Sequence, residues 1–116
     1  MSESAGTKKL TADILVQAPK RFPGVRVWKA GVFTGRTLDG SRIVSAGLKG
    51  SADVSGISPI DAPGGKGRRI EIEVKFGKDR MHGRQPAFRE MILDAGGIHV
   101  IARELEQAMR DLGEQL

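Results

Sequence analysis

The chain has 116 residues, with 19 basic and 14 acidic side chains, a formal net charge of +5 and 39% hydrophobic residues. This length suits one domain over residues 1–116 with one modest core, and the lack of cysteine excludes disulfides and thiolate metal sites. The lack of tyrosine excludes DNA chemistry with a tyrosine nucleophile, while the positive charge favours a polyanionic partner, most simply nucleic acid.

The first half of the chain predicts one helix followed by short strands. We expect residues 1–6 to be disordered and a helix to run from Thr7 to Gln17, with Pro19 stopping or kinking it. An Asp39-Gly40 turn signal indicates a reversal of the chain further on. The strands expected in this half cover residues 25–28, 42–46 and 51–60.

The second half predicts a hairpin and then a strand–helix–strand unit. A Gly-rich turn over 61–67 joins the third strand to Arg69–Phe76, so we expect the two strands to pair. The elements expected after them are a helix over 84–95, a short strand over 98–102 and an amphipathic helix over 105–116. This order predicts an α/β fold with a mixed sheet and at least one right-handed crossover.

The strand Arg69–Phe76 is the most informative segment. Its apolar residues alternate with Glu71, Glu73 and Lys75, which share the other face. One interpretation is a solvated sheet surface, on which such Glu-x-Lys triplets are common. The other is a metal-dependent phosphodiesterase site, with Glu73 on the metal and Lys75 beside the attacking water.

Asp53 favours the second interpretation. If the strands of Asp53 and Glu73 pair through the Gly-rich turn, the two carboxylates share one sheet face. Such a pair is unfavourable unless a cation compensates it, and Mg²⁺ takes oxygen ligands while keeping several waters. The backbone carbonyl of Val74 could supply a third oxygen. The pair therefore predicts a metal site held by Asp53, Glu73 and Val74.

The residues around this pair suggest roles in hydrolysis of a phosphodiester. Lys75 can orient or deprotonate the water, and Gln85 at a helix start can hydrogen-bond the water or a phosphate oxygen. The candidate phosphate contacts are Lys49, Arg84 and Arg89.

At these positions the chain resembles the VRR-NUC family of the PD-(D/E)xK nuclease superfamily. The resemblance covers roughly residues 27–103 and rests on four segments in order: Gly50-Ser-Ala-Asp53, Ile72-Glu73-Val74-Lys75, Gln85 opening a helix, and Gly96-Gly97 before a strand. The small size is similar to that of the stand-alone phage and bacterial members. Two departures are Ala52, where the superfamily name expects proline, and Lys29-Ala30, where many relatives have Arg-Asn.

The resemblance implies a restriction-endonuclease-like core, with a mixed central sheet flanked by helices, and dependence on Mg²⁺ or Mn²⁺. It implies that Asp53 and Glu73 are metal ligands, that Lys75 is catalytic and that Gln85 is an active-site residue. Asp13 is a candidate for an extra ligand on the first helix, and Lys29 a candidate DNA contact. The implied activity is structure-selective cleavage of DNA, such as branched DNA or Holliday junctions, by a homodimer with a place in DNA repair.

Other residues and other functions stay open. We expect surface or structural roles for His82 and His99, a core or interface role for Trp28, and a solvated or edge role for Glu71. The main alternative is a nucleic-acid-binding module on the same fold without catalysis, and a small interaction domain is a third possibility. No apolar run approaches a membrane span, so we expect a cytoplasmic protein without a membrane partner.

Overall fold

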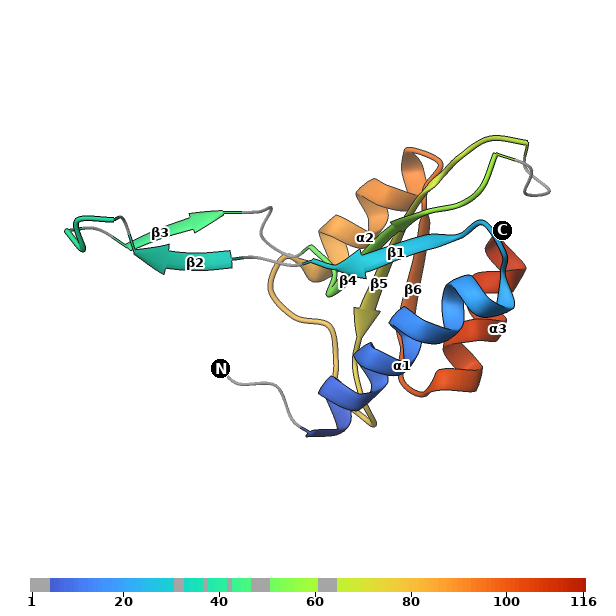
Figure 1. Ribbon diagram of the computed structural model, residues 1–116, viewed down its shortest axis with the longest axis horizontal. Coiled ribbons are helices and arrows are strands. Elements are labelled where there is room, and N and C mark those ends of the chain that lie inside the picture. The colour runs from blue at the N-terminus through green and yellow to red at the C-terminus, as the bar shows by residue number, and fades with distance from the viewer. Residues whose placement is uncertain (1–4, 31–32, 37, 42, 47–50, 61–64) are drawn as a thin grey trace.

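A four-stranded mixed sheet with helices on both faces forms the centre of the molecule (Figure 1). The computed structural model describes residues 5–30, 33–36, 38–41, 43–46, 51–60 and 65–116. Its elements in chain order are α1 (Ala5–Arg21), β1 (Arg26–Lys29), β2 (Phe33–Arg36), β3 (Ile43–Ala46), β4 (Val54–Ile57), β5 (Arg69–Val74), α2 (Gln85–Asp94), β6 (Ile98–Ala102) and α3 (Leu105–Gln115). The expected α/β fold with a mixed sheet flanked by helices is confirmed.

The strands of the central sheet follow the order β1-β4-β5-β6. β4 pairs with its neighbours β1 and β5 in antiparallel fashion, which confirms the hairpin expected across the Gly-rich turn. β5 and β6 are parallel and connected through α2, so the strand–helix–strand unit is also confirmed. The approach of β1 to β4 requires Gly56, because a Cβ there would lie 2.5 Å from the carbonyl oxygen of Arg26.

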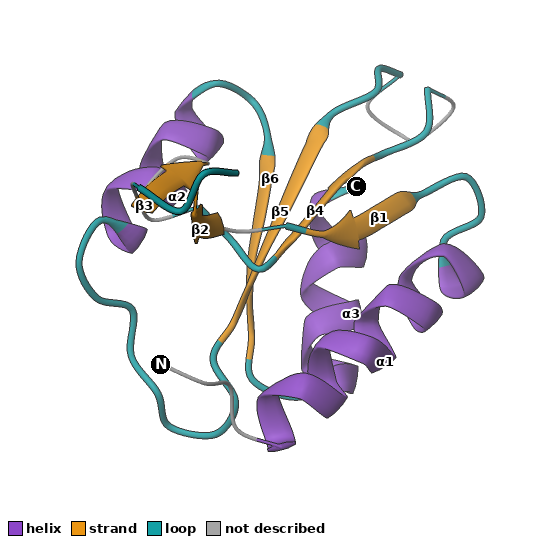
Figure 2. Cartoon of the chain, turned by 60° about the vertical axis from the view of Figure 1, so that its left-hand side comes forward, coloured by secondary structure: helices purple, strands orange, loops and turns teal. Residues whose placement is uncertain are grey.

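The two faces of the sheet are buried in different ways. One face is apolar and packs against α1 and α3, which lie together on the same side of the sheet (Figure 2). The sheet residues of this core are Val54, Ile70, Ile72, Val74, Ile98, Val100 and Ala102. Successive side chains of a strand point to opposite faces of the sheet, so the residues between these core residues lie on the opposite face.

The opposite face carries polar side chains, and its central part is buried. α2 packs against β6 on this side, with Phe88 in edge-on contact with the His99 ring at 6.2 Å between ring centroids. Glu71 and Glu73 are only 1% and 2% exposed. The expectation of a solvated or edge role for Glu71 is therefore wrong, because β5 lies between β4 and β6 in the sheet and this carboxylate is buried.

The first helix is longer than its sequence predicts. Ala5 and Gly6 belong to α1 rather than to a disordered terminus, and residues 1–4 lie outside the described part of the chain. Pro19 does not end the helix, which runs on to Arg21. A proline in the last turn removes only one backbone hydrogen bond, and Phe22 still donates its N–H to the carbonyl of Ala18 at 3.0 Å.

The chain between β1 and β4 forms a second, two-stranded sheet that projects from the central one (Figure 1). β3 spans Ile43–Ala46 and matches the expected strand over these residues. Arg42, the first residue of the expected strand, lies outside the described residues. The Asp39-Gly40 turn is confirmed: Gly40 has a φ of 72°, and Asp39 accepts a hydrogen bond from the Ser41 N–H at 2.9 Å. β2 was not predicted, since four residues with one glycine show no measurable alternation.

The outer edge of β6 is closed by side chains instead of a further strand. The Gln115 amide donates to the His99 carbonyl at 2.9 Å and accepts from the His99 N–H at 3.1 Å. Gln107 donates to the Ile101 carbonyl at 2.9 Å and accepts from the Arg103 N–H at 2.8 Å. Two glutamines of α3 thus satisfy the backbone groups that an edge strand leaves open.

Among the helices of the described residues, none combines the length and the apolar character that crossing a lipid bilayer demands.

Candidate active site

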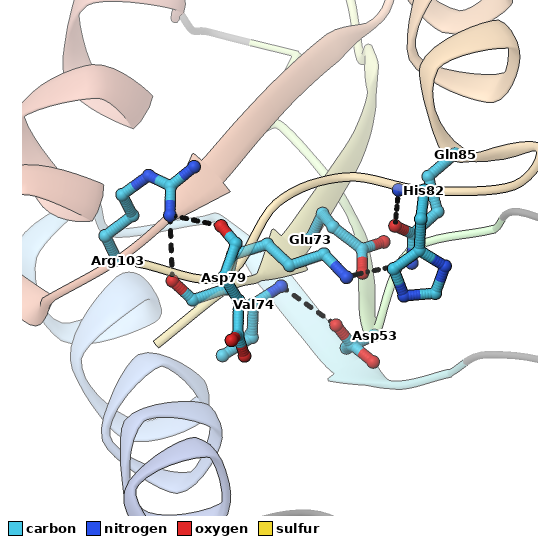
Figure 3. A network of polar contacts seen from close by, with 8 residues as sticks. Asp53, Glu73, Val74, Asp79, His82, Gln85 and Arg103 are labelled. Atoms are coloured by element: carbon cyan, nitrogen blue, oxygen red, sulfur yellow. Dashed lines mark hydrogen bonds and ion pairs between the residues drawn. The ribbon is translucent and has the colours of Figure 1, made fainter. Parts of the chain in front are cut away.

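Asp53 and Glu73 lie opposite each other on neighbouring strands. Val54 pairs with Ile72, and continuing this antiparallel register by one residue places Asp53 beside Glu73. The Asp53 carboxylate accepts a hydrogen bond from the Val74 N–H at 2.8 Å, which fixes it at the end of β5 (Figure 3). The juxtaposition expected from the sequence is therefore present.

Glu73 has a buried carboxylate that is only half satisfied. Its Oε1 accepts a hydrogen bond from the Gln85 amide at 2.9 Å and lies 3.7 Å from the Lys75 ammonium. Its Oε2 is buried and has no hydrogen-bond partner among the described residues. Leaving a charged oxygen buried without a partner costs free energy, so the position calls for a proton or a cation.

The electrostatic surroundings of Glu73 lead to the same conclusion. Burial, and next the negative charge of Asp53, raise the pKa of Glu73 from 4.5 to about 8, although the nearby Lys75 ammonium lowers it. Two carboxylates in one poorly hydrated place resist joint ionisation. A divalent cation between them would remove this cost.

The residues present fit a magnesium ion that is bound by few protein ligands and keeps several water ligands. Within the described residues no three acidic or histidine side chains gather closely enough to hold a metal, but Mg²⁺ is often bound by only one or two carboxylates together with substrate phosphates. Asp53 and Glu73 could supply those two carboxylates. The Val74 carbonyl stays a prediction, since the structure assigns only its N–H, to Asp53.

Asp13 does not join this pair. It lies on α1, on the side of the sheet that packs the apolar core, and binds the Lys9 ammonium at 2.8 Å. α1 packs against the apolar face of the sheet, whereas Glu73 lies on the other face. Along its described residues, the first helix therefore places no third carboxylate beside Asp53 and Glu73. The sequence expectation of Asp13 as an extra ligand is not supported.

Lys75 is buried at the point where β5 ends. Its side chain and backbone are 7% exposed, and its backbone N–H donates to the Ala102 carbonyl of β6 at 2.8 Å. The loop that follows is held by Arg103, whose guanidinium donates to the carbonyl of Gly77 at 3.1 Å. It also donates to the carbonyl of Asp79 at 2.5 Å (Figure 3). Arg103 thus holds the backbone around Lys75, a role that the sequence analysis missed.

Gln85 is positioned by the start of α2. Its side chain donates to Glu73 and accepts from the His82 N–H at 2.9 Å, so the amide is fixed at both ends. Pro86 occupies the first turn of α2, as expected. The sequence prediction that Gln85 belongs to the site is in accord with this geometry.

The candidate DNA contacts are spread over several elements. Arg84 is exposed and immediately precedes Gln85, on the rim of the site. Lys29 is exposed on β1 and pairs with Val54 in the register. It therefore belongs to the apolar face of the sheet, opposite to the face that carries Glu73. Lys49 lies outside the described residues.

Arg89 occupies a different place, beside the outer edge of β6. It lines a pocket of about 220 Å³ together with His99, Asp111, Glu114 and Gln115. A single helical turn separates it from Gln85, but the guanidinium shares this pocket with two acidic residues of α3. Arg89 is thus less suited to a phosphate than the sequence suggested.

Glu71 belongs to a network that the sequence did not indicate. Its carboxylate accepts hydrogen bonds from the Ser55 hydroxyl at 2.9 Å and from Arg69 Nε at 2.6 Å. Both partners lie on the same sheet face as Glu71, in or beside its row of the register. Unlike Glu73, this carboxylate is satisfied by protein groups and has no need of a metal.

His99 is buried next to this network, and we expect it to make the protein sensitive to acid. Burial, and next the positive charge of Arg89, lower the pKa of His99 from 6.5 to about 4. Between these two pH values His99 is protonated in the unfolded chain but neutral in the folded protein. The free energy of unfolding therefore falls as pH drops from 6.5 towards 4. The loss should reach up to about 3 kcal/mol.

The measurement is urea unfolding over this pH range for the wild type and His99→Leu. The variant should lose the part of the pH dependence that comes from His99, because leucine carries no titratable group. His82→Gln, which changes an exposed histidine, is the matched control and should behave as the wild type. An unchanged slope in His99→Leu would contradict the prediction.

Comparison with known proteins returns no match: no family model, no curated protein and no solved structure shows significant similarity to this chain.

Proposed function

We propose that this protein is a metal-dependent DNA endonuclease with a PD-(D/E)xK core of the VRR-NUC type. The observation that carries the proposal is the pairing of half-buried Asp53 with buried Glu73, whose Oε2 has no hydrogen-bond partner among the described residues while Lys75 and Gln85 lie against Oε1. The order of these residues along the chain and the net charge of +5 support the same proposal.

Each residue has a distinct task in this mechanism. Asp53 and Glu73 would hold Mg²⁺ or Mn²⁺, which when bound supplies Lewis-acid polarisation of a phosphodiester and a more acidic water. Gln85 orients the Glu73 carboxylate through its amide. The Lys75 ammonium, 3.7 Å from that carboxylate, is placed to stabilise negative charge that develops on the phosphate during attack.

The chain's own geometry explains why these groups stay in position. Val74 fixes Asp53, the β4–β5 register fixes Glu73 opposite it, and the Ala102 carbonyl with Arg103 fixes the backbone at Lys75. Sites on strands hold catalytic geometry better than sites on loops. We further propose selectivity for branched DNA and action as a homodimer, both of which the sequence resemblance implies.

The test is cleavage of labelled four-way junction, flap, duplex and single-stranded DNA in Mg²⁺, Mn²⁺ or EDTA, with Asp53→Asn as the variant. Asparagine can still accept the Val74 hydrogen bond but removes the charge needed for the metal. We expect cutting by the wild type only with a metal, and a loss of about a hundredfold or more in the variant. Cleavage that survives in EDTA or in Asp53→Asn would refute the proposal.

The alternative is a nucleic-acid-binding module without catalysis, which the basic charge alone favours. It predicts salt-sensitive DNA binding that does not respond to Mg²⁺ and no cutting of any substrate. The same assay with a binding readout separates the two.

A further inference from the structure

A tryptophan with a large exposed surface lies on the same face of the sheet as the acidic pair. Trp28 is 46% exposed on β1, which excludes the core alternative of the expected core or interface role. The register places Trp28 opposite Ser55, and Ser55 opposite Glu71, one row away from Asp53 and Glu73. With the usual strand spacing and rise, the Cα atoms of Trp28 and Glu73 lie about 12 Å apart.

An arginine is fixed over this tryptophan. The Arg69 guanidinium carbon lies 5.9 Å from the centre of the indole ring, and Arg69 Nε donates to the buried Glu71 carboxylate at 2.6 Å. Glu71 is held in turn by Ser55. The guanidinium is therefore restrained between a carboxylate and an aromatic ring, yet 57% of its side chain is exposed.

The neighbouring row adds a second cation and an exposed apolar side chain. Arg26 pairs with Ile57, which pairs with Arg69, so all three belong to the same face as Trp28. Arg26 is exposed, and Ile57 is 46% exposed. We call the surface formed by Arg26, Trp28, Ile57 and Arg69 the Trp28 platform.

We propose that the Trp28 platform binds unpaired bases of a DNA strand whose backbone leads to the Asp53–Glu73 pair. This inference rests on the proposed nuclease function and narrows its substrate to DNA with single-stranded character. Bases stack on aromatic rings and on guanidinium planes without regard to sequence, and a cationic groove follows the phosphates. A planar, partly apolar surface with two arginines, close to the acidic pair, combines these features.

A second copy of the chain fits this surface less well. A symmetric dimer places the same patch of each subunit against the other, so Arg26 and Arg69 would face like charges. A DNA strand instead offers phosphates to the arginines and flat apolar bases to the indole. Charge complementarity thus favours nucleic acid.

The chain provides its own reporter for the test, because Trp28 is its one tryptophan and it has no tyrosine. Lys75→Ala protein in EDTA would be titrated with a single-stranded oligonucleotide, a blunt duplex and an abasic strand of equal length, while a labelled copy reports binding by anisotropy. We expect saturable quenching of tryptophan emission by the single strand, and little by the abasic strand or the duplex. Saturated binding of the single strand without quenching would overturn the proposal.

Substitutions provide a second readout. Trp28→Ala should weaken binding of the single strand by about 5- to 100-fold, and Trp28→Phe by less. Val16→Ala, which shortens an exposed residue on α1, is the matched control and should bind as the wild type. Equal binding by all four proteins would overturn the proposal. So would an elution volume that varies with protein concentration without DNA in the wild type and becomes constant in Trp28→Ala.

The two proposals fail in distinguishable ways. Metal-dependent cleavage without quenching would leave the nuclease intact and remove the platform. Quenching with no cleavage of any substrate would support the platform and remove the nuclease.

Discussion

Lys75→Ala should lose metal-dependent cleavage by about two to three orders of magnitude while still binding DNA. The Lys75 ammonium is 3.7 Å from Glu73 and is buried, so no exposed side chain can take over its charge. Removing it leaves negative charge uncompensated where a phosphate would be attacked. The measurement is single-turnover cleavage with saturating Mg²⁺, beside anisotropy of the same labelled DNA in EDTA.

Lys78→Ala is the matched control for this variant. Lys78 is exposed and lies in the loop directly after β5, three residues from Lys75, so it contributes similar charge without touching Glu73. We expect its cleavage rate to stay within about threefold of the wild type, as is usual for exposed charges. Equal losses in both variants would mean that Lys75 acts only through the general charge of this region.

Glu73→Gln should stabilise the metal-free protein and abolish its stabilisation by metal. In the wild type without metal, the Glu73 pKa is raised to about 8, against 4.5 in the unfolded chain. The folded protein therefore retains a proton that the unfolded chain has released, and the free energy of unfolding falls as pH rises through this window. Glutamine does not titrate, so near the upper end of the window the variant should be more stable by about 1–3 kcal/mol.

The measurement is thermal unfolding in EDTA and in Mg²⁺, at a pH below and a pH above the raised pKa of Glu73. We expect Mg²⁺ to raise the melting temperature of the wild type at the higher pH and to leave Glu73→Gln unchanged. Glu104→Gln, which changes an exposed carboxylate at the start of α3, should still respond to Mg²⁺. A wild type that ignores both Mg²⁺ and Mn²⁺ would contradict the assignment of Asp53 and Glu73 to a metal.

The stability cost of Glu73 is a reason to regard the site as functional. The buried Glu73 carboxylate beside Asp53 lowers the stability of the metal-free fold, and a structural role could be filled by a pair of side chains that do not repel each other. Glu71, two residues earlier on β5, shows the contrast: Ser55 and Arg69 satisfy its carboxylate directly.

The sequence predicts the arrangement of these residues well because most of them belong to regular elements. Alternation on β5 assigns Glu73 and Lys75 to one face, the Gly-rich turn pairs that strand with β4, and both inferences need only the period of a strand. The position of Gln85 follows from a helix start with proline in its first turn. These residues meet in the structure as expected.

The contacts that were missed depend on tertiary structure. His99 packs against Phe88 of α2, and Glu71 is held by Ser55 of the neighbouring strand and by Arg69. No local period encodes these contacts. In the sequence, nothing distinguishes Arg103 from other basic residues that precede a helix. In the structure it holds the loop after β5 by donating hydrogen bonds to backbone carbonyls. The continuation of α1 past Pro19 depends on its packing against the core, which overrides the local tendency of proline.

The glutamine amides along β6 determine where this sheet can grow. Gln107 and Gln115 already occupy the backbone groups of His99, Ile101 and Arg103 on that side, so an incoming strand would have to displace two side chains before gaining any hydrogen bond. Extension of the sheet by another polypeptide is therefore directed to β1 at the far end. β1 carries Trp28, so if the Trp28 platform binds DNA as proposed, a strand joined to β1 would compete with DNA for the neighbouring surface. Association between copies and DNA binding would then depend on each other.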